Sequence, residues 1–246
     1  MRASRPCVIS AFLAAACLVP ACTAATGGEQ TPRQRTPARA AAESVATLAP
    51  TFAPTPAPTP TPRPRIVTDT AWRPFASVGG VTLVHPSARV ERVAFHESNH
   101  DGARQLELLP GAVAPVTLET RERGTGSRTA ADIVSHPGIG LRSPVTGTVK
   151  RAGSYVLYCD WSDGFVVIEP DAHPGWEVKL LHIHGVRVRP GARVVAGQTQ
   201  LADRPSRLAF ESQVDELSPG EAWPHVHVEV VDPSIPDRPT PGGGCK

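Results

Sequence analysis

The stretch Trp223-Pro224-His225-Val226-His227-Val228-Glu229-Val230 places two histidines one residue apart in an apolar run. In a β-strand, side chains at positions i and i+2 point to the same face. We therefore predict that His225 and His227 project side by side, while the valines of the run point into a core. Neutral imidazole is a common zinc ligand, so the pair is a candidate metal site. A solvated strand face is the alternative, and residues elsewhere in the chain must decide between the two.

Outside this stretch, short apolar runs broken by Gly and Pro continue from Trp72 onward. The runs that we predict as strands are 81–84, 90–95, 147–149, 154–158, 165–168, 176–181, 187–188, 193–195 and 226–231. Turn signals separate them, among them Ser162-Asp163-Gly164. Many short strands at close spacing predict a mainly β domain over residues 71–236, an antiparallel β-sandwich or barrel-sandwich hybrid.

The N-terminus is predicted to be an export signal over residues 1–21. A positive start precedes an apolar run that is too short for a membrane span. Residues 18–22 resemble a bacterial lipoprotein box in which Cys22 is lipidated. The alternative is a secretory signal cleaved near residues 24–25. We expect an exported protein, either anchored by lipid to the outer face of a bacterial membrane or secreted to the cell envelope.

Residues 22–70 are rich in Pro, Thr and Ala, which predicts a disordered linker, and residues 237–246 are predicted to be a flexible tail. After removal of the signal, Cys159 and Cys245 remain as candidates for a disulfide, since an exported compartment allows pairing. Two unrelated thiols are the alternative. The net charge of +2 gives no polyanion signature, so nucleic acid is not an expected partner.

A resemblance to a known family rests on segments that follow one another in the chain. They are Ser127–Val134, Leu141–Gly153, Lys179–Ile183, Val188–Gln198 and Pro224–Val230. The series resembles the lysostaphin/LytM-type zinc metallopeptidases, which cut peptide bonds in bacterial peptidoglycan. The resemblance covers roughly residues 124–232 and implies a LytM-like β domain with a duplicated hybrid motif.

The resemblance also implies roles for individual residues. Asp132 and His227 fall on zinc-ligand positions, and His182 and His225 fall on the two catalytic histidines. Zinc is then the implied cofactor: it would polarise the scissile carbonyl and lower the pKa of a water molecule. The two catalytic histidines would orient that water, transfer its proton or stabilise the oxyanion.

One family position is filled by the wrong residue type. Arg128 stands where the family has its first histidine ligand, and a guanidinium has no lone pair to offer a metal. Its charge is instead suited to pairing with Asp132. We therefore consider His96 or His100 as the third ligand, with a polar surface loop as the alternative for both. Glu229 is either a strand residue with local hydrogen bonds or a partner of a ligand histidine.

Three functions remain open at this point. The first is a zinc endopeptidase acting on peptidoglycan peptides. The second is a non-catalytic relative that binds peptidoglycan or regulates a partner wall hydrolase, which Arg128 favours. The third is a biotinyl or lipoyl carrier domain, which segments 143–153 and 188–202 also resemble. A carrier needs a modified lysine at a turn, whereas Lys179 lies in a predicted strand, so we disfavour it.

Overall fold

The computed structural model describes residues 64–238. The predicted signal, the proposed lipidation site Cys22, most of the predicted linker and Cys245 lie outside this range. No helix within the described range is long and apolar enough to cross a membrane.

Strands dominate the described residues, with one short 3-10 helix, η1 (Asp215–Leu217). The strands are β1 (Thr68–Asp69), β2 (Pro74–Val78), β3 (Val81–Val84), β4 (Arg89–His96), β5 (Glu107–Leu108), β6 (Val116–Thr117), β7 (Ala130–Ser135), β8 (Leu141–Arg142), β9 (Gly147–Leu157), β10 (Trp161–Pro170), β11 (Glu177–Val186), β12 (Arg193–Val194), β13 (Gln200–Pro205) and β14 (His225–Val231).

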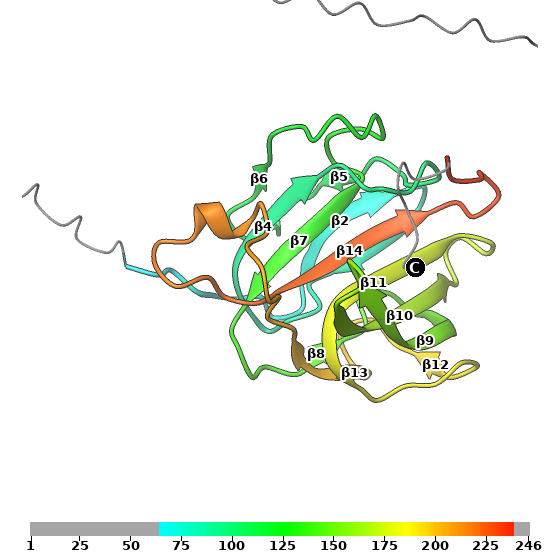
Figure 1. Cartoon of the computed structure of the whole chain (residues 1–246). Coiled ribbons are helices and arrows are strands. Elements are labelled where there is room, and N and C mark those ends of the chain that lie inside the picture. The colour runs from blue at the N-terminus through cyan, green and yellow to red at the C-terminus, as the bar shows by residue number, and fades with distance from the viewer. Residues whose placement is uncertain (1–63, 239–246) are drawn as a thin grey trace, which may run out of the picture. The chain divides into compact units, whose positions relative to one another are not determined.

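Two sheets form from these strands (Figure 1). The larger sheet has the order β1-β4-β7-β14-β11-β10-β9-β12, with β6, β8 and β13 attached beside this path. The smaller sheet has the order β3-β2-β5. Neighbouring strands are antiparallel, apart from the parallel pair β4 and β6. The prediction of a mainly β, antiparallel fold is confirmed, and the described strands do not close into a barrel.

The hydrophobic core joins the two sheets. Phe75 and Leu83 of the smaller sheet belong to the same buried cluster as Ile133 and Leu180 of the larger sheet. Along β14, Val226, Val228 and Val230 have no exposed surface and lie in this cluster, as the alternation of the sequence predicts.

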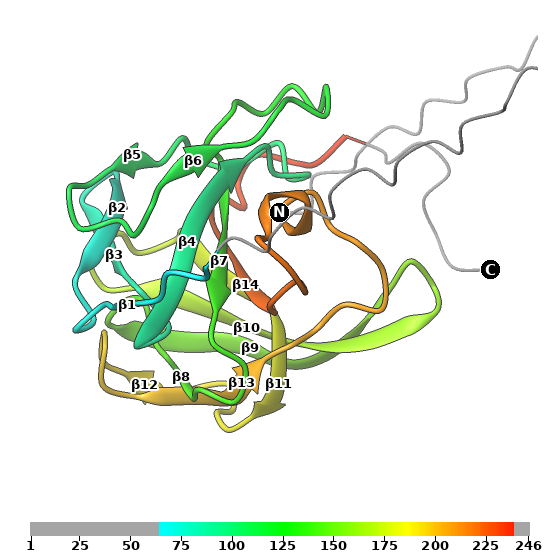
Figure 2. The same ribbon diagram turned by 90° about the vertical axis from the view of Figure 1, so that its left-hand side faces the viewer.

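The opposite face of the larger sheet carries a second, smaller cluster. Ala94 and Val134 pack there against Val214, which lies in the connection between β13 and β14 just before η1. Figure 2 shows this connection passing beside β7 and β14. The polar side chains described below project from this same face.

Ordered structure extends slightly beyond the predicted domain limits. β1 lies within the range 22–70 predicted as linker, and it pairs with β4 through Thr68 and Val90. At the other end, Arg238 of the predicted tail donates from Nε to Asp101 Oδ1 at 2.7 Å. Composition alone does not register such pairings, because they depend on residues far away in the chain.

The turn predicted at Ser162–Gly164 is wrong, since these residues lie inside β10. The hairpin between β9 and β10 instead turns at Tyr158 and Cys159, which both have positive φ angles. Gly164 is required for close packing, because a Cβ there would lie 2.2 Å from the carbonyl oxygen of Ile183. Cys159 is disulfide-bonded. Its predicted partner Cys245 is outside the described residues, so the pairing stays a prediction.

Candidate metal centre and surrounding histidines

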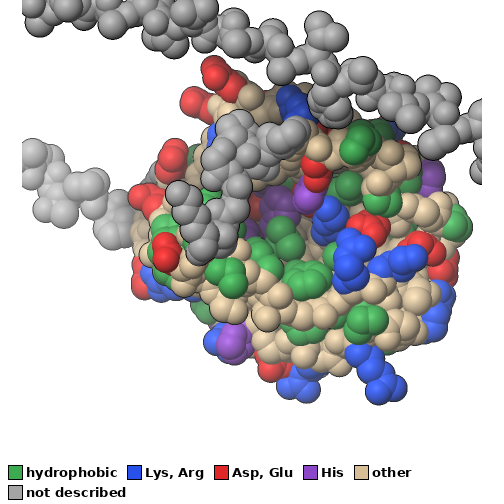
Figure 3. Space-filling model, turned by 45° about the vertical axis from the view of Figure 1, so that its right-hand side comes forward, with side chains coloured by type: hydrophobic (Ala, Val, Ile, Leu, Met, Phe, Trp, Pro, Cys, Tyr) green, Lys and Arg blue, Asp and Glu red, His purple; other side chains and the backbone are tan. Residues whose placement is uncertain are grey.

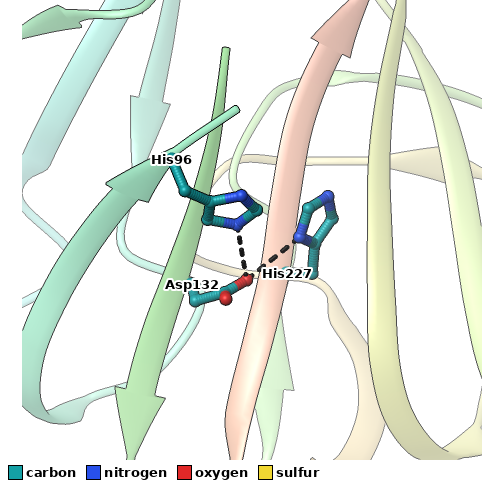
Figure 4. A group of neighbouring side chains, drawn as sticks. All are labelled: His96, Asp132 and His227. Carbon is teal, nitrogen blue, oxygen red and sulfur yellow. Dashed lines mark hydrogen bonds and ion pairs between the residues drawn. The ribbon is translucent and has the colours of Figure 1, made fainter. Parts of the chain in front are cut away.

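Four adjacent strands carry the polar residues that the sequence singled out. Asp132 of β7 lies opposite Ala94 of β4 on one side and opposite His227 of β14 on the other. His96 follows Ala94 by two residues, so its side chain points to the same face. The antiparallel register therefore brings His96, Asp132 and His227 together, although they are far apart in the chain (Figure 4).

The distances within this group are short. His96 Nε2 lies 3.1 Å from Asp132 Oδ1, and His227 Nδ1 lies 3.0 Å from the same oxygen. One potential ligand atom from each residue lies within 4.8 Å of the others. All three residues are largely buried, and together they offer two imidazoles and one carboxylate.

These residues fit a zinc ion. Bonds of about 2 Å in tetrahedral directions place ligand atoms about 3.3 Å apart, close to the spacings seen here. His96 Nε2 is buried and forms no hydrogen bond among the described residues, and its polar neighbour is Asp132 Oδ1 at 3.1 Å. Its other nitrogen, Nδ1, lies 2.9 Å from Glu97 O, which only accepts, and 3.0 Å from Arg121 Nη2, which only donates. A proton on Nδ1 bonded to the carbonyl leaves the lone pair on Nε2. A donor set of two histidines and a carboxylate is typical of catalytic zinc sites.

The Glu229 carboxylate contacts the ring of one ligand candidate, His227. Its Oε2 atom lies 3.5 Å from His227 Nε2, on the side of the ring opposite Asp132. The same oxygen accepts a hydrogen bond from Ser98 Oγ at 2.5 Å, and the side chain is almost completely buried. Such a carboxylate fixes the orientation of a ligand histidine, which was the second of the two roles considered for Glu229.

The charges in the cluster shift its protonation. Burial would raise the pKa of Asp132, but the charges of His96 and His225 and the hydrogen bond from His227 hold it well below its usual range. Burial would lower the pKa of His227, but hydrogen bonds to Asp132 and Glu229 raise it to about 9. Without metal, His227 is therefore a cation held between two carboxylates at neutral pH.

His182 reaches the cluster because β11 is irregular at this residue. The β10–β11 register passes from Phe165–Leu181 to Gly164–Ile183, which leaves His182 as the extra residue of a bulge. Its φ angle of 60° is unusual for a residue other than glycine. β11 also changes partners here, since Leu181 pairs with His227 of β14 whereas Ile183 pairs with Pro205 of β13. A bulge re-aims a side chain that strict alternation would point to the opposite face.

A carboxylate orients the ring of His182. His182 Nδ1 lies 3.0 Å from Asp163 Oδ2, while Asp163 Oδ1 accepts from Gly164 N at 2.8 Å and from Ser206 Oγ at 2.6 Å. Tyr155 Oη also lies 3.0 Å from His182 Nδ1. Burial and the Asp163 carboxylate raise the pKa of Tyr155, so its hydroxyl stays protonated. Because the Asp163 carboxylate only accepts, Nδ1 of His182 carries the proton of their hydrogen bond, and Nε2 is left with the lone pair.

His225 has a different environment from His227, although both project from β14. Its Nε2 atom lies 3.9 Å from Asp132 Oδ2, and its ring packs edge-on against His182 with centroids 5.1 Å apart. Burial lowers the pKa of His225 to about 4, against the opposing effect of Asp132. His225 is therefore neutral at pH 7.

These groups share one cavity of about 300 Å³. Its lining includes the three ligand candidates, His182, His225, Tyr155, Tyr158, Phe210, Arg121 and Arg123. On the face shown in Figure 3, histidine side chains gather beside hydrophobic and basic side chains. The arrangement places a candidate metal-binding set, a neutral histidine (His225) and a histidine held by a carboxylate (His182) on the walls of one cavity.

The structure separates His96 from His100, the two candidates for the third ligand. His100 Nε2 lies 3.3 Å from Glu229 Oε1, and its Nδ1 lies 2.7 Å from Asp237 Oδ2. His100 is therefore not part of the ligand group. Arg128 forms no ion pair with Asp132 among the described residues, and its backbone carbonyl bonds to Leu106 N at 2.8 Å.

Comparisons with known proteins give a distant likeness among solved structures. No protein-family model matches the chain, and no curated protein matches its sequence. Among solved structures, the chain is similar to a zinc containing peptidase from Vibrio cholerae. That match has 19% sequence identity and a TM-score of 0.30, and it covers 63% of this chain and 42% of that chain.

Sequence reasoning missed Asp163, Tyr155, Arg121 and Arg123 at this cavity. Asp163 was interpreted as a turn residue because Gly164 follows it and an Asp-Gly pair usually signals a turn. The signal that could have identified Asp163 is its position as an acidic residue between two segments that both have a strand pattern. The two arginines lie in an irregular connection, where no periodicity indicates direction.

Proposed function

We propose that this chain is a zinc-dependent peptidase that cleaves peptide bonds of bacterial cell-wall peptidoglycan. The observation that carries the proposal is the presence, in one cavity, of the group His96, Asp132 and His227 beside His182 and His225. The wall as substrate is supported by the family resemblance of residues 124–232. Export as a lipoprotein or secreted protein is supported by the composition of residues 1–22.

The residues of the cavity divide the work of hydrolysis between them. A zinc ion held by the three ligand candidates would supply Lewis-acid chemistry at the scissile carbonyl. His182 Nε2 can take a proton from the attacking water as its oxygen bonds to the carbonyl carbon, while Asp163 stabilises the imidazolium. The same proton then passes to the leaving amine as the C–N bond breaks. His225 is neutral and can donate a hydrogen bond to the negative charge that develops on the carbonyl oxygen.

The proposal is tested by metal analysis together with digestion of purified peptidoglycan. We expect one zinc per chain and release of soluble wall fragments. His182→Ala and His225→Ala should abolish release and keep the zinc, whereas His96→Ala should lose the zinc. A wild-type protein that releases nothing with zinc bound would refute the peptidase.

A non-catalytic wall-binding or regulatory domain is the second candidate, and one observation favours it. Without metal the two carboxylates already have cationic partners, because His227 donates to Asp132 and faces Glu229, and Lys179 Nζ lies 3.8 Å from Glu229 Oε1. Under this alternative, the protein would sediment with peptidoglycan or with a partner hydrolase and release no fragments. Its binding would be insensitive to a chelator.

A further inference from the structure

Two arginines enter the cavity from the connection between β6 and β7. Arg121 Nη2 lies 3.0 Å from His96 Nδ1, so its guanidinium stands beside the ring that offers a ligand atom to the metal. Arg123 Nη1 donates to Glu97 O at 2.7 Å. Both side chains line the same cavity as the ligand candidates.

Neither guanidinium is neutralised by a side chain of the described residues. Across residues 64–238, no carboxylate forms an ion pair with Arg121 or Arg123. Glu211 also lines the cavity without pairing with either. Burial and the nearby charge of Arg121 lower the pKa of Arg123, so the two cations repel each other in the absence of an anion.

The connection that carries the arginines is fixed before any ligand arrives. The Glu97 carboxylate accepts hydrogen bonds from Thr120 Oγ1 at 2.7 Å, from Arg121 N at 2.9 Å and from Arg123 N at 3.0 Å. Arg238 Nη2 adds a bond to Arg123 O at 2.8 Å. Glu97 is thereby occupied with backbone groups, and a pre-ordered loop lowers the entropy cost of binding.

We propose that Arg121 and Arg123 form a carboxylate subsite beside the metal ligands, so that the cavity prefers peptides with a free carboxylate next to the bond to be cut. A guanidinium presents a planar pair of donors that matches a carboxylate. A chain terminus and an acidic side chain offer the same chemistry, and the experiment distinguishes them. The choice of a peptide as ligand rests on the proposed function.

The test uses short peptides that differ at one group and zinc-loaded protein. One pair differs as terminal acid or terminal amide, and a second pair differs as Glu or Gln beside the scissile bond. We expect the acid member of one pair to have a kcat/KM about tenfold or more above its amide. The pair that shows the difference identifies the source of the carboxylate. In Arg121→Gln and Arg123→Gln this ratio should fall toward one.

The ratio of kcat/KM for acid and amide peptides is the readout because Arg121 contacts His96, and loss of the Arg121 side chain can alter zinc occupancy. Reduced occupancy lowers both members of a pair equally and cancels in the ratio. Arg189→Gln is the matched control, since it removes an exposed positive charge outside the cavity and should keep the wild-type ratio. If Arg123→Gln does not fold, Arg121→Gln decides alone, because the Arg121 side chain is exposed and makes no backbone bond.

A ratio near one in the wild type, or a wild-type ratio kept in both folded arginine variants, would overturn the subsite and leave the peptidase standing. If no peptide is cut, calorimetry with the same peptides separates the two ideas. If the wild type binds the acid peptides more tightly than the amides, and Arg121→Gln removes this difference, the subsite is supported even though hydrolysis has failed. Equal binding of acid and amide overturns the subsite.

Discussion

Replacing Asp163 with Asn tests how His182 is positioned for proton transfer. Asp163 Oδ1 accepts from Gly164 N and Ser206 Oγ, and the oxygen of Asn can keep both bonds. The amide nitrogen must then occupy the Oδ2 position, 3.0 Å from His182 Nδ1. An amide nitrogen only donates, so it forces the lone pair of His182 onto Nδ1 and the proton onto Nε2.

The expected cost follows from the hydrogen bond that is lost. A hydrogen bond to a charged group contributes about 1.5–3 kcal/mol, so its loss alone should lower kcat/KM for peptide hydrolysis about 10- to 100-fold. The fall should be larger, up to about 10,000-fold, because a proton on Nε2 also removes the lone pair that accepts the proton of the water. Zinc content should not change, because Asp163 contacts none of the ligand candidates. Ser206→Ala is the matched control: it keeps the carboxylate and removes a single neutral donor, so a loss below about tenfold is expected.

Nitrogen-15 chemical shifts of the His182 ring provide a readout that does not depend on catalysis. We expect the protonated nitrogen to change from Nδ1 in the wild type to Nε2 in Asp163→Asn. An unchanged tautomer together with unchanged kcat/KM would refute the role of Asp163. A thermal unfolding curve close to that of the wild type confirms that the variant folds.

Three further predictions concern the metal, the pH and the core. His96→Ala should lose the zinc that the wild type binds, whereas His100→Ala should keep it, as elemental analysis would show; equal retention in both would contradict the assignment of His96. Because His227 has a pKa of about 9, zinc binding at pH 7 should release about one proton, and affinity should rise up to about tenfold per pH unit until pH 9. Calorimetry in two buffers of different ionisation heat measures this release. The same proton stabilises the metal-free fold fully below pH 6.5, and this contribution is lost as the pH rises through about 9. Leu180→Ala in the core should lower the free energy of unfolding by about 2–5 kcal/mol, and Leu108→Ala, which is 42% exposed, by less than about 1 kcal/mol; equal losses in chemical denaturation would refute this account of the core.

The sequence was sufficient for features that depend on one strand. The alternation around His225 and His227 predicted both the burial of the intervening valines and the shared face of the two histidines. The same rule predicted β3 with its residues 81–84. Such predictions succeed because the two-residue period of a strand is local and does not require knowledge of its neighbours.

Features that depend on two strands were beyond the sequence pattern. His182 points into the cavity because of a bulge, and nothing in Leu181-His182-Ile183 indicates where the extra residue lies. Asp163 was assigned to a turn because the Asp-Gly pair is a strong hairpin signal. In the structure the turn is built from Tyr158 and Cys159, residue types that rarely adopt positive φ angles. Gly164 instead allows the backbone of β10 to lie close to Ile183 of β11.

Arg128, which stands where the resembled family has its first histidine ligand, illustrates how the proposed metal site would be completed from a neighbouring strand. A motif on one chain segment requires the ligand to lie four residues before Asp132, and there the chain has no donor. β4 lies directly beside β7, however, and its last residue His96 pairs with Ala130, two positions from Asp132 on the same face. An imidazole extends far enough to cover this diagonal, and its Nε2 arrives 3.1 Å from the aspartate oxygen. An arginine at position 128 is therefore compatible with the proposed metal site, because the sheet fixes distances between strands that sequence spacing does not record.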